Sequence, residues 1–317
     1  MMSNIDNLIS QSNSNNFKII KLDYIPERQQ IILLKTKQNL ELFIEVLNLK
    51  TNDIKEISLN EKIYAKPYGR IEFHSIDDEN FYLSADSLHF KINSNGEIIL
   101  KDQLDSKISS LNHKHVLKNY IFREDLELID LKDLKKYNLT GFFDDHFDQY
   151  DFIYFYFDDR YSIFSSSNED IVIIIVYCKD GDDPKCFHCI LKIESPENIR
   201  VLFVDKIDDL GKYYVISKNL SELAYQKHFL DDDNVYVRKL SIEKFKEPES
   251  FAIDNNAELI FFNAHQFILL YDEKIEILER YSNNLLKSIS IDQDSPYKIK
   301  KDMLLYVKDV KLNYTEF

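Results

Sequence analysis

The sequence predicts an all-β fold, a β-propeller of six or seven blades, from three observations. Apolar runs rich in Ile, Phe and Tyr recur along the 317 residues, with 22 Phe, 20 Tyr and no Trp, and such side chains favour strands. With only 5 Gly and 6 Pro, the turns must depend on Asn and Asp, as at Asn95-Gly96 and Asn52-Asp53. The third observation is a recurrence of strands and turns at roughly constant spacing.

The clearest hairpin lies within residues 168–194. Residues 171–177 (Ile-Val-Ile-Ile-Ile-Val-Tyr) form an unbroken β-branched run, followed by a polar Asp/Gly/Pro loop and a second apolar run at 186–193. Because the first run does not alternate with polar residues, we expect both of its faces to be covered, as in an inner strand of stacked sheets.

Shorter strand-like runs precede and follow this hairpin. They lie at 30–34, 40–49, 80–84, 87–92, 97–100, 116–122, 126–131, 137–140, 199–204, 223–229, 235–242, 250–253, 258–262, 266–271 and 274–278.

These runs form a repeating unit of strand, tight turn, longer strand, polar turn and short strand. The polar turns align at Lys50, Asn93, Lys132, Glu194, Glu243 and Glu273. Their mean spacing is about 45 residues, and a period of about 40–50 residues with three or four strands per unit is typical of propeller blades. Residues 17–22 and 303–314 are then expected to share one blade, which would close the ring and remove a sheet edge.

The predicted domain organisation is a disordered Ser/Asn-rich tail at residues 1–16 and a single propeller domain at 17–317. No Trp-Asp, Gly-His or paired-glycine signature assigns the repeat to a propeller family. A two-domain α+β fold is the alternative. It would place helices at 103–117, 126–137, 220–229 and 277–289, which permit helical spacing.

The net charge of −15 argues against non-specific nucleic-acid binding and against an anionic membrane surface, since both require Lys and Arg. It favours a basic protein partner. The N-terminus lacks the pattern of a secretory signal, the apolar runs are too short to span a bilayer, and three Cys do not indicate a disulfide scaffold. We therefore expect a cytoplasmic protein, and the Lys/Ile/Asn-rich composition suggests a bacterial source.

No motif for a cofactor, a metal or catalysis is present. Cys178, Cys186, His188 and Cys189 resemble a zinc site, but a strand at 186–193 would place Cys186 and Cys189 on opposite faces, so packing roles are expected. The Asp-rich loops at 180–183 and 231–234 lack the spacing of an EF-hand. Nucleophile and phosphate-binding motifs are missing.

One segment, residues 141–161, combines ten aromatic residues with six aspartates and lies in the longest step of the repeat. It is either a core strand at 152–157 between acidic turns or a partner-binding surface, where aromatic rings supply contact area and carboxylates meet a basic partner. The candidate binding residues here are Asp144, Asp145, Phe147, Asp148, Tyr150, Asp158 and Asp159. A second candidate loop contains Asp231, Asp232 and Asp233.

The function that these features predict is non-catalytic protein binding. Within that class we favour an immunity protein that inhibits a basic toxin through an acidic, aromatic surface. One alternative is a hydrolase or lyase on a propeller scaffold, which would need Asp, Glu or His converging from several inner strands. Another is a secreted effector or scaffold that binds host proteins.

Overall fold

The computed structural model describes most of the chain. The described residues are 2–15, 17–65, 71–77, 79–85, 88–103, 114–116, 120–123, 127–130, 132–133, 135–139, 141–142, 164–165, 171–180, 183–207, 211–217, 221–227, 234–240, 249–253, 256–300 and 302–317. They divide into two compact units. Unit 1 contains residues 1–111, 131–134 and 290–317, and unit 2 contains residues 112–130 and 135–289.

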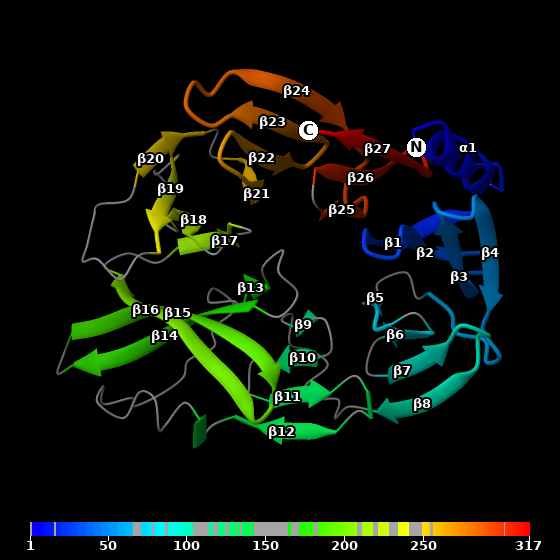
Figure 1. Ribbon diagram of the computed structural model, residues 1–317, viewed down its shortest axis with the longest axis horizontal. Coiled ribbons are helices and arrows are strands. Elements are labelled where there is room, and N and C mark those ends of the chain that lie inside the picture. Colours follow the sequence, from blue (N-terminus) through cyan, green and yellow to red (C-terminus); the bar gives the residue numbers. More distant parts are fainter. Residues whose placement is uncertain are drawn as a thin grey trace. The chain divides into compact units, whose positions relative to one another are not determined.

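Unit 1 holds one helix and three antiparallel sheets (Figure 1). The helix is α1 (Met2–Asn13). The first sheet contains β1 (Lys18–Ile25), β2 (Gln30–Thr36), β3 (Leu42–Asn48) and β4 (Asp53–Ser58). The second contains β5 (Ile71–Ser75), β6 (Asn80–Ala85), β7 (Leu88–Asn93) and β8 (Ile98–Gln103). The third contains β25 (Tyr297–Lys300), β26 (Met303–Lys308) and β27 (Lys311–Glu316).

Unit 2 holds four sheets of four strands each. They contain, in order, β9 (Lys114–Val116), β10 (Tyr120–Arg123), β11 (Glu127–Asp130) and β12 (Lys136–Asn138); β13 (Phe164–Ser165), β14 (Ile171–Asp180), β15 (Asp183–Ser195) and β16 (Asn198–Ile207); β17 (Gly211–Ile216), β18 (Glu222–Lys227), β19 (Asn234–Lys239) and β20 (Glu249–Ala252); and β21 (Glu258–Phe262), β22 (Gln266–Tyr271), β23 (Lys274–Glu279) and β24 (Leu285–Ser290).

This succession of small antiparallel sheets, each built from consecutive strands, is a β-propeller, and the predicted fold class is confirmed. Seven sheets lie in the described residues. Their third strands begin at residue 42 in the first sheet and at residue 311 in the seventh, a mean spacing of about 45 residues. All four stretches proposed as helices in the α+β alternative contain strands in the described residues: β9, β11 and β12, β18, and β23 and β24.

The polar-turn alignment is correct for most sheets and wrong at one position. Lys50, Asn93, Lys132 and Glu194 lie at or next to the turn that follows the third strand of a sheet, and residue 243 lies outside the described residues. Glu273, however, follows β22, the second strand of its sheet. The equivalent turn is residues 280–284, between β23 and β24, which explains the short last step of the predicted period.

Individual turns follow the chemistry expected of them. Gly96 has φ +84° between β7 and β8, and a Cβ there would lie 2.0 Å from the Ser58 carbonyl oxygen. The Asn93 Oδ1 accepts hydrogen bonds from the backbone N–H groups of Asn95 and Glu97. Asn52 takes φ 62° before β4. Left-handed Asn and Gly therefore make these reversals, as the sequence predicts.

The predicted hairpin around residues 168–194 is also confirmed. β14 pairs with β15 in antiparallel register from Ile171↔Lys192 to Asp180↔Asp183. β14 has β13 on its other side, and so it is an inner strand of its sheet.

The chain ends differ from the predictions in two ways. Residues 2–13, expected to lie in a loose tail, form α1, with Ile5, Leu8 and Ile9 buried against β2 and β26 residues of unit 1. The predicted shared blade is wrong, because β1 pairs with β2 in the first sheet whereas residues 303–314 form β26 and β27 of the last.

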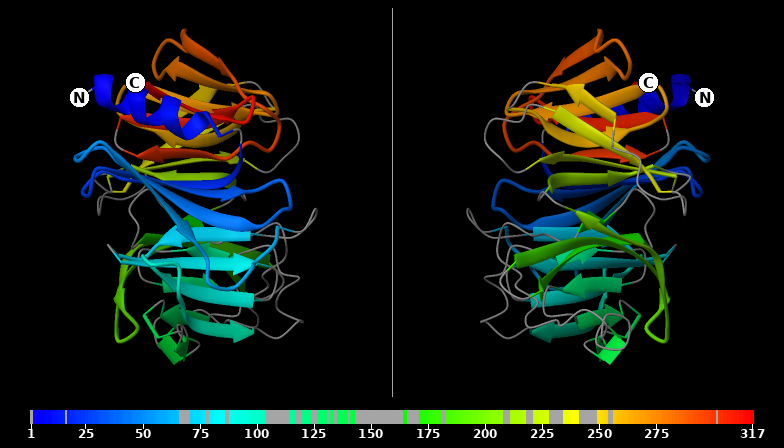
Figure 2. Two further views of the ribbon diagram at one scale, coloured as in Figure 1. Left: turned by 90° about the vertical axis from the view of Figure 1, so that its right-hand side faces the viewer. Right: turned by 90° about the vertical axis from the view of Figure 1, so that its left-hand side faces the viewer.

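Helix α1 lies beside β27, the last strand of the three-stranded sheet. Figures 1 and 2 show it beside β27, where a fourth strand would pair. The Asn13 amide donates through Nδ2 to the Leu312 carbonyl oxygen at 3.0 Å and accepts through Oδ1 from the Leu312 N–H at 2.8 Å. One side chain thus makes the pair of bonds that a neighbouring strand would make, and the helix covers this edge.

A buried ion pair holds the end of α1 on the first sheet. Lys35 Nζ lies 2.6 Å from Glu45 Oε1 and donates to the Ser12 carbonyl oxygen at 2.9 Å and to the Ser12 Oγ at 2.8 Å. The Ser12 Oγ donates to the same Glu45 oxygen. All three residues are buried. Because buried charges persist only where they are paired and hydrogen-bonded, this triad fixes where the helix ends.

Candidate functional site

The binding residues predicted from the sequence lie outside the described residues. This holds for Asp144, Asp145, Phe147, Asp148, Tyr150, Asp158 and Asp159, and for Asp231, Asp232 and Asp233. Their role stays a prediction. The candidate site that the structure does describe lies in unit 2, at the turn between β23 and β24.

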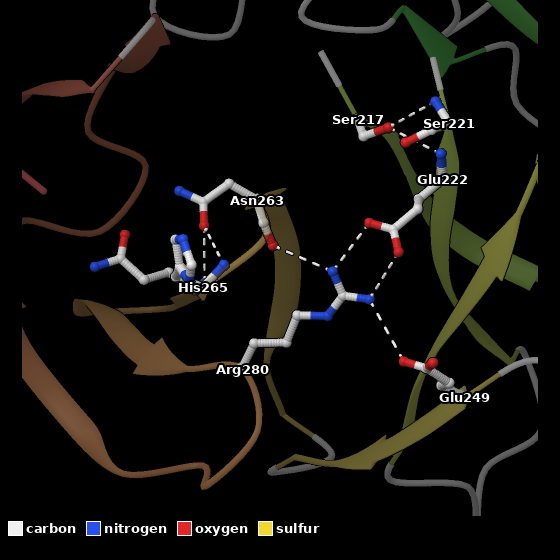
Figure 3. Close-up of polar contacts among 8 residues, drawn as sticks. Ser217, Ser221, Glu222, Glu249, Asn263, His265 and Arg280 are labelled. Atoms are coloured by element: carbon white, nitrogen blue, oxygen red, sulfur yellow. Dashed lines mark hydrogen bonds and ion pairs between the residues drawn. The ribbon is translucent and has the colours of Figure 1, made fainter. Parts of the chain in front are cut away.

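Arg280, the first residue of that turn, is the centre of a buried polar cluster (Figure 3). Its side chain is 2% exposed. The guanidinium makes two parallel bonds to Glu222, from Nη1 to Oε2 at 3.0 Å and from Nη2 to Oε1 at 3.1 Å. Glu249 lies 3.6 Å from Nη2. Arg280 therefore joins the β17–β20 sheet, which supplies both carboxylates, to the β21–β24 sheet.

The guanidinium stays charged in this buried place. Burial alone would lower the pKa of Arg280, but the hydrogen bonds and charge of Glu222, with Tyr281 and Glu249, raise it above its usual value. Three aromatic rings complete the environment, with the guanidinium carbon 5.5 Å from the Phe251 ring centre, 5.9 Å from that of Phe262 and 5.4 Å from that of Tyr281. These distances are those of cation–π contacts.

Neighbouring turns position the partners of Arg280. The Ser217 Oγ accepts from the N–H groups of Ser221 and Glu222 at the start of β18, the strand from which the Glu222 carboxylate reaches Arg280 (Figure 3). The Asn263 Oδ1 accepts from the N–H groups of His265 and Gln266, both at 2.8 Å, and so shapes the turn between β21 and β22. The Arg280 N–H donates to the His265 carbonyl oxygen from that turn.

The β23–β24 turn itself is also tied to its neighbours. Asn283 takes φ 54°, and its Nδ2 donates to the Ala252 carbonyl oxygen of β20 at 2.8 Å. The Asn283 N–H donates to the Glu279 carbonyl oxygen, and the Ser282 Oγ donates to the Glu279 carboxylate. A short turn with this many bonds has a defined conformation before any partner binds.

Three large apolar side chains project from this turn and from β24. Tyr281 is 72% exposed, Leu285 55% and Leu286 52%. The Tyr281 ring nevertheless contacts Arg280 and lies edge-on to Phe251, with ring centres 6.1 Å apart. We call Tyr281, Leu285 and Leu286 the β24 surface. Exposed Glu249 and Glu279 lie at its border.

The β24 surface has the composition of a protein-binding site. Tyr281, Leu285 and Leu286 expose large apolar side chains close together in the sequence, and a Tyr already held by its neighbours loses little freedom on binding. Tyr281, Leu285 and Leu286 are not among the binding residues predicted from the sequence, and residues 277–289 entered that prediction only as a possible helix of the α+β alternative. The detectable signal was an aromatic residue and two leucines flanking the polar turn Ser282-Asn283-Asn284.

A second cluster, in unit 1, brings ionisable residues together from three first strands. β1 lies against β5 and β25. Asp23 of β1, only 2% exposed, lies 3.3 Å from Lys298 Nζ and 3.9 Å from Lys300 Nζ on β25. His74 Nδ1 on β5 is 3.7 Å from the Asp23 Oδ2. The first strands of three sheets thus bring one carboxylate, one imidazole and two ammonium groups close together.

This cluster favours a structural role over proton transfer. Burial raises the pKa of Asp23, but the charges of Lys298, His74 and Lys300 and the N–H of Tyr24 outweigh it, so the pKa is lowered overall. A carboxylate with a lowered pKa is a weak base, whereas a general base works best with a pKa near the working pH. Through its contacts with His74, Lys298 and Lys300, Asp23 links three sheets of unit 1.

Other features of the described residues do not form sites. Within those residues, no group of three or more His, Cys, Asp or Glu side chains is placed to hold a metal ion. An open cavity of about 630 Å³ lies between α1 and β27, but Tyr314 and Leu312 of β27 already bond its polar residues Asp6 and Asn13. Among the helical residues described, we find no segment with the length and apolar character required to cross a membrane.

Comparison with known proteins supports the fold but does not assign a function. No family model matches this chain, and no curated protein matches it. Among solved structures, a chain of the mitotic checkpoint complex matches with TM-score 0.55 and 9% identity over 94% of this chain and 87% of that one. Hydrazine synthase of Kuenenia stuttgartiensis matches with TM-score 0.52 and 8% identity over 95% and 96%.

A third similar structure is named as a propeller. It is the β-propeller domain of Myceliophteria thermophila Cps50 (Swd1), with TM-score 0.48 and 10% identity over 94% of this chain and 98% of that one. At identities of 8–9%, the first two matches show a shared architecture and nothing more. The assignment of function therefore depends on the site.

Proposed function

We propose that this chain is a non-catalytic protein-binding propeller and that the β24 surface contacts its partner. The observation that carries the proposal is the exposure of Tyr281, Leu285 and Leu286 around a turn held by buried Arg280. Aromatic and apolar side chains at the centre of an interface, with charged groups at its border, are the usual arrangement of protein-binding surfaces.

Charge selects the class of partner. The chain carries a net charge of −15, and the groups bordering the β24 surface include the exposed carboxylates Glu249 and Glu279. A basic protein would be attracted by this field and oriented by it, mainly through a faster association rate. A protein of similar negative charge would be repelled.

Within this class, an inhibitor of a basic toxin is the specific function that we favour, as an immunity protein in the cytoplasm of a bacterium. Support for this narrower proposal comes from the charge and composition, because toxins that act on nucleic acid or membranes are often basic. The predicted segment at 141–161 would supply a second acidic, aromatic contact.

The test is affinity capture from the native cell with two matched columns. One carries the wild-type chain and the other carries the triple variant Tyr281→Ser, Leu285→Ser, Leu286→Ser. These side chains are exposed, so the variant should keep its fold, which its unfolding temperature checks. Both columns are loaded at low salt and eluted with rising salt.

A basic protein that the wild-type column retains to high salt and the variant column releases early would support the proposal. Equal retention on both columns would mean that the β24 surface does not contact the partner. If only acidic or neutral proteins bind, and salt does not release them, the basic-partner proposal is wrong.

A further inference from the structure

Helix α1 is part of the contact between the first and the last sheets of unit 1. Its buried side chains Ile5, Leu8 and Ile9 belong to one apolar cluster, which also holds residues of β1, β2 and β3 from the first sheet and of β26 and β27 from the last. In Figure 1, α1 lies next to β4 and β27, the last strands of these two sheets. The helix therefore covers apolar side chains of both sheets.

Polar bonds at the end of α1 are shared between the same two sheets. The Ser12 Oγ donates to the Glu45 carboxylate and accepts from the Lys35 Nζ, both in the first sheet. One residue further along, the Asn13 side chain makes two bonds to the backbone of Leu312 in the last sheet. Because all of these bonds require the helix end in one position, α1 has a single defined docking place.

The contact of β4 with the second sheet is built differently. The Asn60 N–H, just after β4, donates to the Gly96 carbonyl oxygen at 2.9 Å, and the Asn60 Oδ1 accepts from the Ile98 N–H at 3.2 Å. There the chain that leaves one sheet bonds directly to the turn and strand of the next. The contact between the first and last sheets depends in part on a separate helix.

Helix α1 has little stability of its own. Six of its 12 residues are Ser or Asn, which are weak helix formers. Its first turn has no acidic residue and its last turn no basic residue to oppose the helix dipole. Isolated helices of this length are marginal in water. The segment is therefore helical because it is docked, and undocking and unfolding of α1 are one event.

The surface under the end of α1 also favours release. The Lys35 and Glu45 side chains are 1% and 3% exposed while Ser12 is bonded to both. A buried ion pair is a weak source of stability, because the two charges regain hydration when they are uncovered. Uncovering this part of the first sheet therefore costs less free energy than uncovering an apolar surface of the same area.

We propose that residues 2–15 are a reversible closing segment. In the closed state α1 joins the last strands of the first and last sheets, a role that the sequence analysis had given to a blade shared by the two ends of the chain. In the open state α1 undocks as one unit while the sheets stay folded, and the edge of β27 and the apolar surface under the helix are uncovered. This inference does not depend on the β24 surface.

Native-state hydrogen exchange of the full chain tests this inference, because one amide reports on docking. The Leu312 N–H donates to the Asn13 side chain, so its protection requires α1 in place. In urea below the unfolding transition, the hydrogen-bonded amides of α1 and the Leu312 amide should exchange together, at least about tenfold faster than those between β2 and β3. Their exchange should also depend less on urea, since partial opening exposes less surface.

A core variant of the first sheet separates undocking from unfolding. Ile44 on β3 is fully buried against the second sheet, on the face of the strand opposite to Glu45. Ile44→Val destabilises the sheet, and the amides between β2 and β3 should exchange about fivefold faster. The α1 and Leu312 amides should keep their wild-type rates, because undocking leaves Ile44 in place.

Two serines of α1 provide the matched variants for docking itself. Ser12→Ala removes the bonds to the buried ion pair and destabilises the closed state, from which both undocking and unfolding start. All of these amides should therefore exchange about tenfold faster. Ser10 is exposed on the same helix, and Ser10→Ala should change the rates by no more than about twofold.

Two results would overturn the inference. If Ile44→Val accelerates the α1 and Leu312 amides as much as those of the sheet, α1 leaves only when the sheet unfolds. If the Leu312 amide exchanges faster than the α1 amides in wild type, Asn13 moves while α1 stays docked. Should Ile44→Val fail to fold, the urea dependence of the wild-type rates still decides between undocking and unfolding.

Discussion

The edge strands β27 and β24 differ in what covers them. At β27, helix α1 lies along the edge and the Asn13 amide replaces a neighbouring strand. At β24, the edge carries Leu285 and Leu286 and has Tyr281 next to it. Each edge is supported by a buried ion pair, Lys35–Glu45 under α1 and Arg280–Glu222 at the turn before β24.

This difference indicates that the exposure of Leu285 and Leu286 on β24 has a use. The chain covers one edge with a helix and carries several charges on another, but on β24 two leucines are exposed beside a single charge, Lys287. Since exposed apolar edges favour aggregation, such an edge is expected to persist where it has a use. The following predictions test the two edges against each other, beginning with the largest effect.

The largest loss of stability is expected from breaking the ion pair under the covered edge. Lys35→Ala leaves the Glu45 carboxylate buried without its ammonium partner, and removing one member of a buried pair costs about 3–5 kcal/mol. Urea unfolding should show this loss. The double variant Lys35→Met, Glu45→Leu leaves no buried charge and should recover much of it; no recovery would mean that the pair itself is not the cause.

Beside β24, Arg280→Met should cost less, about 2–3 kcal/mol, because its partners Glu222 and Glu249 are partly exposed and water can solvate them. The variant should also weaken partner binding, since the Tyr281 ring loses the cation beside it. Urea unfolding and binding of the captured partner measure the two effects. Arg280→Lys is the control, because it keeps the charge and loses the two parallel bonds.

Opening the covered edge is expected to have a moderate effect. Asn13→Ala removes two hydrogen bonds to Leu312 and should cost about 1–2 kcal/mol. Hydrogen exchange should become faster at the Leu312 amide. If coverage of β27 by α1 prevents self-association, the variant should self-associate in analytical ultracentrifugation. Asn39→Ala, at an exposed turn in the same unit, should change neither measurement.

Acid should weaken unit 1 through Asp23. Its pKa is lowered in the folded state, so the unfolded chain takes up this proton at a higher pH than the folded chain does. The stabilisation is complete above about pH 4, the usual Asp value, and is lost as the pH falls through the lower folded value. Urea unfolding of wild type and Asp23→Asn should therefore differ at pH 6 and converge at low pH; a constant difference would contradict this.

The smallest stability effect is expected in the segment predicted from sequence. Replacing Asp144, Asp145 and Asp148 together with Asn should weaken binding of a basic partner and change the unfolding temperature little. A large loss of stability would mean that this segment is structural. Binding that falls here and is unchanged by the triple Ser variant of the β24 surface would move the proposed contact to residues 141–161.

Local signals predicted much of the fold. The β-branched run of β14 and the Asn95-Gly96 turn depend on neighbouring residues, and the period of about 45 residues is a succession of such local patterns. Each of these predictions is confirmed. The alignment failed at Glu273 because a polar turn after a second strand looks the same as one after a third. Helix α1 was missed because its Ser/Asn composition hid Ile5, Leu8 and Ile9, which recur at helical spacing.

The site was less predictable, because it depends on contacts between residues far apart in the sequence. Arg280 and Glu222 are 58 residues apart, and Asp23 meets lysines from the other end of the chain. Nothing in the residues around Arg280 indicates a buried guanidinium. The exposure of Leu285 and Leu286 follows from the place of β24 at the end of its sheet, which the sequence does not reveal.

The most direct test of the central claim is hydrogen–deuterium exchange of the chain with and without the partner obtained from the capture column. The account predicts slower exchange at the amides of β24 and no change at Leu312 of the covered edge. Protection confined to residues 141–161 or 231–233, with β24 unchanged, would contradict it.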